Sequence, residues 1–177
     1  GIYNVTVIST PGQLTDHYNP TNQTVNLSEG VFNSTSVAAA AVAAHECGHA
    51  VQHATAYGPL RLRSALVPVV SMASQVVSWI LLAGILLVQT FPALLLFGIG
   101  LFAMTTLFSV ITLPVEIDAS RRATVWLQRA GITSNHEQPM AVSALRSAAY
   151  TYVVAALSSL ATLIYYVLIF MGSQRDE

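Results

Sequence analysis

Residues 93–113 read ALLLFGIGLFAMTTLFSVITL and contain no charged side chain. The hydrocarbon core of a bilayer is about 30 Å thick and is crossed by about 20 helical residues. Two further uncharged runs of similar length occupy residues 66–88 and 148–171. One such run could be the core helix of a soluble protein, but three in one chain predict three transmembrane helices.

The composition of the chain agrees with this prediction. Hydrophobic residues make up 54% of it and charged residues 8%, whereas soluble proteins are about a quarter charged. We therefore expect a lipid bilayer as a partner. A formal net charge of −1 without a basic stripe argues against a nucleic acid, because phosphate binding needs clustered Lys or Arg. The single cysteine excludes an intramolecular disulfide framework.

The first predicted segment, residues 1–58, combines short strands with one helix. Alternating side chains at residues 3–8 predict a strand, and residues 14–18 and 25–28 flank a turn at Asn19 and Pro20, which predicts a hairpin. Residues 34–36 offer an N-cap for a helix that runs from Val37 to about Ala56, and the Gly-Pro pair that follows predicts its stop.

Four further segments complete the predicted organisation. Residues 64–113 form a transmembrane helical hairpin that turns at residues 89–92. Pro114 is expected to break the second span, so that a separate amphipathic helix begins at Val115. The remaining boundaries define a surface segment at 114–147, the last span at 148–172 and a tail at 173–177. Within the surface segment, residues 134–146 are read as a polar link. The predicted fold class is mainly α, with three transmembrane helices and a small α+β zincin-like zinc domain at the membrane surface.

His45, Glu46 and His49 spell the motif H-E-x-x-H on the predicted helix. The i, i+4 spacing places both imidazoles on one helical face, about 6 Å apart in rise, where both can reach one metal ion. Neutral imidazole suits zinc, and Glu46 would lie where it can take a proton from a water in the open coordination position. The alternative is a pair of structural histidines with buried partners.

A third ligand must come from elsewhere in the chain. His53 lies about 12 Å along the helix from His45, too far to share the metal, and Cys47 points to the other side of the helix. The acids downstream of the motif are Glu116, Asp118 and Glu137.

Glu116 follows a span in an apolar setting, where an unpaired carboxylate would be costly, and is the preferred ligand. Two spans separate it from His49, so both residues emerge on the same side of the membrane. The alternative is that Glu116 stabilises its own helix N-terminus or pairs with Arg121.

Five successive motifs carry a resemblance to a known family: LTDHYNP, LSEGVF, VAAHECGHAVQH, LPVEIDASRRA and LRSAAYTYVVAAL. In this order they resemble the YugP-like group of bacterial membrane-bound neutral zinc metallopeptidases, over almost the whole chain. Members usually begin with a further membrane span, whereas this sequence opens in what corresponds to the soluble part.

The resemblance implies a gluzincin-type site, with His45, His49 and Glu116 as zinc ligands and Glu46 as catalytic base. It also implies that the LTDHY and NLS segments form an edge strand and hairpin beside a cleft, where an extended substrate adds as another strand.

The sequence thus predicts an integral-membrane zinc endopeptidase that hydrolyses a peptide or protein substrate at the membrane surface. Alternatives are a catalytically inert zinc-stabilised scaffold and an intramembrane protease, although the spans carry no acid. His17, His136 and Arg121 are candidate donors to the oxyanion.

The arginines predict the orientation in a bacterial plasma membrane, because only Arg175 lies on the side opposite the motif. The zinc site is therefore expected on the cytoplasmic side and the C-terminus outside.

Overall fold

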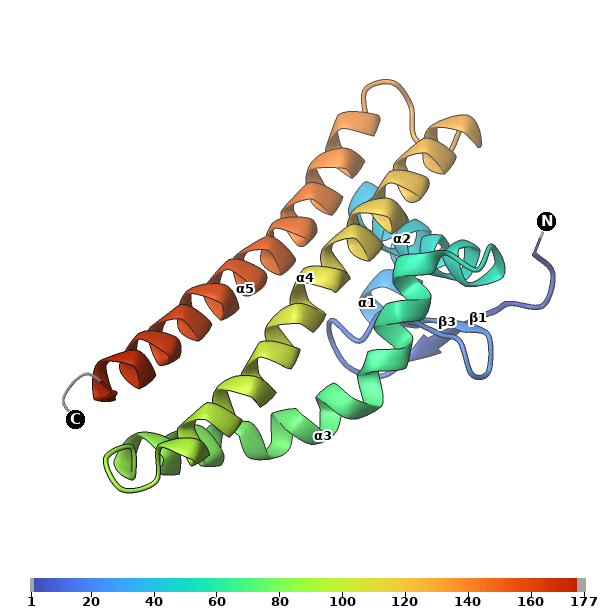
Figure 1. The fold of residues 1–177 in the computed structure, drawn as a ribbon. Helices are drawn as coiled ribbons and strands as arrows, with labels where there is room; N and C mark the ends of the chain where they lie inside the picture. Colours follow the sequence, from blue (N-terminus) through green and yellow to red (C-terminus); the bar gives the residue numbers. More distant parts are fainter. Residues whose placement is uncertain (1, 175–177) are drawn as a thin grey trace. The chain divides into compact units, whose positions relative to one another are not determined.

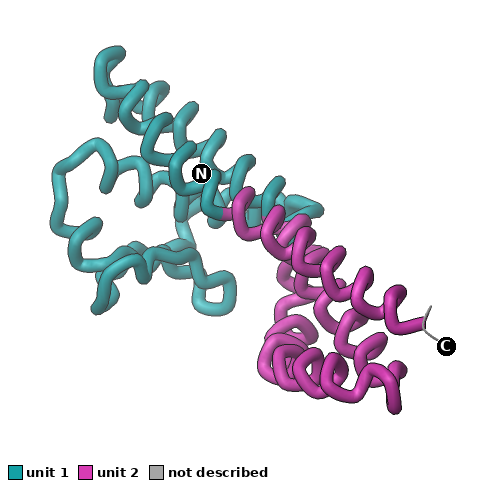
Figure 2. The backbone as a smooth tube through the Cα atoms, turned by 90° about the vertical axis from the view of Figure 1, so that its left-hand side faces the viewer, with its two compact units in different colours: residues 1–61, 113–151 teal, residues 62–112, 152–177 magenta. Residues whose placement is uncertain are grey.

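The structure is a computed structural model that describes residues 2–174, with the elements labelled in Figure 1. Residues 175–177 of the predicted tail, including Arg175, lie outside the described residues. The chain divides into two compact units, coloured separately in Figure 2. Unit 1 comprises residues 1–61 and 113–151, and unit 2 comprises residues 62–112 and 152–177.

Unit 1 contains a three-stranded sheet in the order β1-β3-β2. The predicted hairpin is present, because β2 (His17–Asn19) pairs antiparallel with β3 (Thr24–Ser28). The predicted first strand is β1 (Thr6–Thr10), which pairs parallel with the other side of β3. This leaves β2 at one edge of the sheet and β3, the most buried strand, in the centre.

A short helix α1 (Glu29–Phe32) leads into α2 (Val37–Ala54), the helix that carries the H-E-x-x-H motif. Ser36 is its N-cap, as the sequence predicted, and its hydroxyl accepts a hydrogen bond from the Ala39 N–H. The predicted stop at the Gly-Pro pair was wrong in detail. The helix already ends at Ala54, and Gly58 opens the next helix, because proline is tolerated in the first turn, where its missing N–H has no intrahelical partner.

The predicted break at Pro114 was also wrong. Helix α4 runs without interruption from Pro92 to Arg129. Proline removes only one backbone hydrogen bond, and the turns beyond it have packing of their own. Val115, Ala119, Ala123 and Leu127 follow one another at i+4 spacing and are all buried, so this face of α4 holds its helical conformation.

The predicted polar link at residues 134–146 is largely helical, because α5 extends from Gln138 to Ser173. A reciprocal pair of hydrogen bonds precedes it: the Ser134 N–H donates to the Glu137 carboxylate and the Glu137 N–H donates to the Ser134 hydroxyl. Such a capping box starts a helix even in a polar sequence. The first turns of α5 then contribute Ala141 and Leu145 to the core of unit 1, together with Ala41, Ala44, Ala123 and Leu127.

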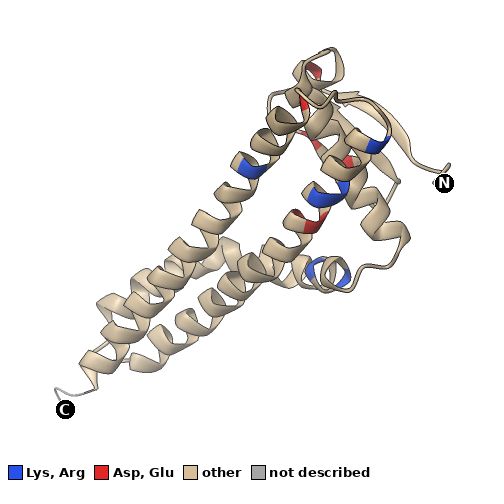
Figure 3. Ribbon diagram, turned by 90° about the horizontal axis from the view of Figure 1, so that it is seen from above, with Lys and Arg blue, Asp and Glu red and all other residues tan. Residues whose placement is uncertain are grey.

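Unit 2 contains most of α3 (Gly58–Leu86) and the apolar parts of α4 and α5. These three helices are each long and apolar enough to cross a membrane, as the sequence predicted. Among the described residues of unit 2, Arg63 is the only charged side chain, and the charges drawn in Figure 3 otherwise belong to unit 1. Within unit 2, Val77 and Leu81 of α3 pack with Leu95 and Ile99 of α4.

Candidate metal centre

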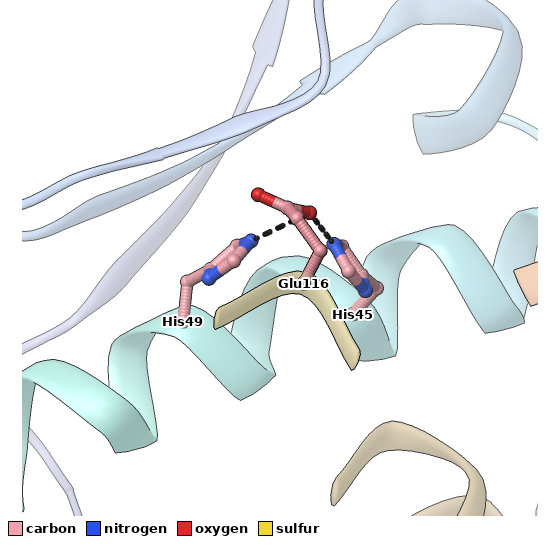
Figure 4. A group of neighbouring side chains, drawn as sticks. All are labelled: His45, His49 and Glu116. Atoms are coloured by element: carbon pink, nitrogen blue, oxygen red, sulfur yellow. Dashed lines mark hydrogen bonds and ion pairs between the residues drawn. The ribbon is translucent and has the colours of Figure 1, made fainter. Parts of the chain in front are cut away.

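Two helices of unit 1 bring three predicted ligands together (Figure 4). His45 and His49 project from α2, and Glu116 projects from α4 between them. The Nε2 atoms of the two histidines lie 3.2 and 3.6 Å from the same carboxylate oxygen, Oε2 of Glu116. Within the described part of the chain, these are the residues whose donor atoms are grouped closely enough to hold a metal ion, all within 4.8 Å of one another.

The spacing of these atoms fits a tetrahedral zinc ion. With bonds of about 2.05 Å, two ligand atoms of a tetrahedron are separated by about 3.3 Å. The distances from the histidines to the glutamate lie on either side of this value. Two imidazole nitrogens and one carboxylate oxygen are also a donor set that catalytic zinc accepts, with a fourth position left for water. The residues present therefore suit zinc in both chemistry and geometry.

Both histidines are held by residues that the sequence analysis did not identify. The His45 Nδ1 lies 3.0 Å from the Ser120 hydroxyl, and the His49 Nδ1 lies 3.0 Å from Oε1 of Gln52. These partners leave each Nε2 directed toward Glu116. Helical spacing could have identified both partners from the sequence. Ser120 is four residues after Glu116 and Gln52 is three residues after His49, so each lies on the same helical face as that residue.

Gly48 allows the two helices to approach closely enough for these contacts. A Cβ atom at this position would lie 2.7 Å from the Ala119 carbonyl oxygen and 3.1 Å from the Ala119 Cα. The backbone of α2 therefore rests directly on α4 between Glu116 and Ser120. Gly48, one of the two unspecified positions of the H-E-x-x-H motif, therefore has a packing role: it allows α2 to lie close to α4.

Glu46 is buried next to the ligands, with 8% of its surface exposed. Burial raises the pKa of its carboxyl above the ordinary value, and the adjacent His49 and His45 oppose this only in part. A hydrogen bond from the backbone of Tyr18 in β2 also reaches the carboxylate. A raised pKa makes the carboxylate a stronger base.

The pKa of His49 is raised as well, although for a different reason. Burial by itself lowers it, but the hydrogen bond to Glu116 and the negative charge of that residue outweigh the effect of burial. The carboxylate therefore stabilises positive charge at His49. A divalent cation between the two groups would benefit from the same attraction.

The other residues considered from the sequence lie apart from the three ligands. His53 is exposed, and its Nδ1 is 2.9 Å from the Tyr18 hydroxyl. Cys47 lines an apolar cavity together with Trp126 and Arg122, which agrees with its expected position on the other side of the helix. Asp118 accepts a hydrogen bond from the Arg122 Nε at 2.6 Å, from one turn further along α4.

Comparison with known proteins gives the family. The model of the family described as "Putative neutral zinc metallopeptidase" matches residues 1–171. The chain is also 45% identical over 179 residues to the "Putative membrane protease YugP" of Bacillus subtilis (strain 168), an alignment that covers 100% of this chain and 77% of that protein. No solved structure matches it. With a match over nearly its whole length, this chain belongs to the neutral zinc metallopeptidase family.

Proposed function

We propose that this protein is an integral-membrane zinc endopeptidase with a gluzincin-type site, in which His45, His49 and Glu116 hold zinc and Glu46 is the catalytic base. The proposal is carried by one observation: a carboxylate oxygen of Glu116 lies close to the Nε2 atoms of His45 and His49, and the buried carboxylate of Glu46 lies beside them. The family match and the relative named a membrane protease support it independently.

Zinc bound to these three ligands would supply a Lewis acid that lowers the pKa of a water in the open position and polarises the scissile carbonyl. The residues of the chain would do the remaining work. Glu46 accepts the proton of the attacking water and later donates it to the leaving amine. Its raised pKa strengthens it as a base for the first of these steps.

The substrate of this site would be an extended peptide. Strand β2 lies at an edge of the sheet, and a backbone group of its Tyr18 reaches Glu46. An edge strand offers unpaired N–H and C=O groups to which another strand can add. A peptide added along β2 would pass next to the proposed base, which supports hydrolysis of a peptide or protein substrate.

For the location, we propose the bacterial plasma membrane with the site on the cytoplasmic side. The three apolar helices support a membrane location. The arginines of unit 1 (Arg61, Arg121, Arg122, Arg129 and Arg146) support the cytoplasmic side, because positively charged segments remain preferentially inside.

The test is Glu46→Gln, which replaces the base with an amide of the same size. We expect the purified variant in mild detergent to retain about one zinc per chain and to lose casein hydrolysis, because the carboxamide cannot accept the proton of the water while the three ligands are unchanged. Glu29→Gln is the matched control, since Glu29 is an exposed acid in α1, and it should keep full activity.

The outcomes separate the proposal from its alternatives. Hydrolysis at the wild-type rate by Glu46→Gln would reject the mechanism. A wild-type protein that holds zinc but hydrolyses no peptide would instead be an inert zinc-stabilised scaffold. Cleavage restricted to substrates embedded in a bilayer would indicate an intramembrane protease.

A further inference from the structure

Gln52 is a wholly buried polar side chain that lies one turn beyond the motif. Its exposed surface is 0%, and it makes three hydrogen bonds. Oε1 accepts from the His49 Nδ1 at 3.0 Å, and Nε2 donates to the Val115 carbonyl and to Oδ2 of Asp118, each at 2.8 Å. A buried amide without partners is costly, whereas this one has a partner for each group.

The partners of Gln52 determine which way its amide faces. A backbone carbonyl and a carboxylate can only accept hydrogen bonds, so the atom between them must be the NH₂ group. A flipped amide would place its oxygen against two acceptors. The oxygen must therefore face His49.

This orientation in turn determines the tautomer of His49. An amide oxygen accepts but does not donate, so the Nδ1 of His49 must carry the proton, and the lone pair of the neutral ring must lie on Nε2. Nε2 is the atom that faces Glu116. The buried amide thus selects the form of the imidazole that can bind a metal ion at this centre.

The network continues from Gln52 to the surface of α4. Asp118 is fixed by the Nε of Arg122 at 2.6 Å, and the guanidinium of Arg122 lies 5.8 Å from the ring centre of Tyr57. Gln52 is therefore held by two points on α4, the helix that carries Glu116. One side chain joins the ligand helix α2 to the backbone and to a side chain of the other ligand helix.

His45 has no comparable constraint. Its Nδ1 partner is the Ser120 hydroxyl, which can either donate or accept and so is compatible with both tautomers. The two histidines thus differ in what holds them, and the stricter constraint acts on His49.

We propose that Gln52 is a positioning residue of the metal centre, which fixes His49 in its Nδ1-protonated form and directs Nε2 toward the metal, while Asp118 and the Val115 carbonyl hold Gln52 in place. This inference rests on the proposed function, because it assumes that His49 is a zinc ligand. Partners of ligating histidines that act in this way contribute about 10- to 100-fold to metal affinity.

The experiment compares Gln52→Met with Gln52→Glu in the full chain, purified in mild detergent. Methionine has a similar size and offers no acceptor to His49, so zinc affinity measured by competition with a fluorescent chelator should fall about 10- to 100-fold. Glutamate keeps an oxygen facing His49. Its other oxygen would face two acceptors, the Val115 carbonyl and the Asp118 carboxylate, so we expect this buried carboxyl to be protonated and to donate to one of the two. It should hold zinc within about threefold of the wild type.

A role limited to joining the helices would remove the difference between the variants, because Gln52→Glu also weakens the attachment to α4 and would then bind zinc as poorly as Gln52→Met. That result, or wild-type zinc affinity in Gln52→Met, would overturn the inference. If Gln52→Met does not fold, as judged by circular dichroism, Gln52→Glu decides alone: affinity within threefold of wild type supports the inference, and any larger loss overturns it.

Cobalt provides a second readout that a purely structural role would not change. The visible absorption of Co²⁺ bound to the wild type should be retained in Gln52→Glu and altered in Gln52→Met, because the band shape reports ligand geometry. Failure of the proposed function would look different, since the wild-type protein itself would then bind no zinc or hydrolyse no casein. The two failures are therefore distinguishable in one set of preparations.

Discussion

Gly48→Ala tests whether the close approach of α2 to α4 is what assembles the centre. The added Cβ would lie 2.7 Å from the Ala119 carbonyl oxygen, whereas carbon and carbonyl oxygen in contact are separated by about 3.3 Å or more. The helices must therefore move apart by about 0.6 Å. Ligand distances in a metal site tolerate only about 0.2 Å, so the displaced Glu116 could not remain in place.

This substitution is expected to have a small effect on the stability of the metal-free protein and a larger effect on its zinc affinity. Alanine gains about 1 kcal/mol over glycine in a helix, and overpacking costs about 1–3 kcal/mol. The metal-free protein should therefore be destabilised by no more than about 2 kcal/mol and should remain helical. To bind zinc, the variant has to bring the two helices back together and so pay the overpacking energy. A cost of about 1–3 kcal/mol on binding corresponds to a 5- to 150-fold loss of zinc affinity.

The assay is chelator competition for zinc, with casein hydrolysis and circular dichroism on the same samples. Gly100→Ala is the matched control, because Gly100 is likewise inside a helix, here α4, and a Cβ there would meet nothing within 4 Å. It should bind zinc as the wild type does. If Gly48→Ala also binds zinc normally, the close contact with Ala119 is not what holds the ligands together, and the reasoning is refuted.

Two further predictions concern the third ligand and the orientation. Glu116→Ala should lower zinc occupancy and hydrolysis together, whereas Asp118→Asn should keep its metal, because Asp118 is two residues along the helix and the asparagine oxygen can still accept from Gln52. Metal content by plasma mass spectrometry decides between them, and zinc retained in Glu116→Ala but lost in Asp118→Asn would reverse the assignment. For the orientation, alkaline phosphatase fused after the last residue should be active and a green fluorescent protein there dark; the reverse pattern would place the C-terminus in the cytoplasm.

The sequence was sufficient to predict which three residues lie together at the candidate centre. His45 and His49 follow from helical spacing, and Glu116 follows from the even number of spans and from the cost of an unpaired acid in an apolar setting. These arguments depend on residues close in sequence or on membrane topology. The grouping of the three residues in the structure agrees with them.

The contacts of Gln52 and Ser120 could not be predicted in the same way. They depend on the register between α2 and α4, which is set by the packing of Gly48 on Ala119. Pro114 was misread for a related reason, because a local rule about proline was applied where the buried face of α4 on both sides keeps the helix continuous. Local patterns indicate which residues are available, whereas packing decides which of them touch.

The alanine-rich core of unit 1 has a consequence for the evolution of this protein. Ala41, Ala44, Ala123 and Ala141 are all buried at the junction of α2, α4 and α5. Only glycine is smaller than alanine, so almost every substitution at these positions adds volume. Sequence drift would therefore push the helices apart at the junction. Mutational tolerance here is therefore one-sided. An inherited enlargement of one helix could persist only if a facing side chain became smaller, and facing alanines leave glycine as the single compensating choice.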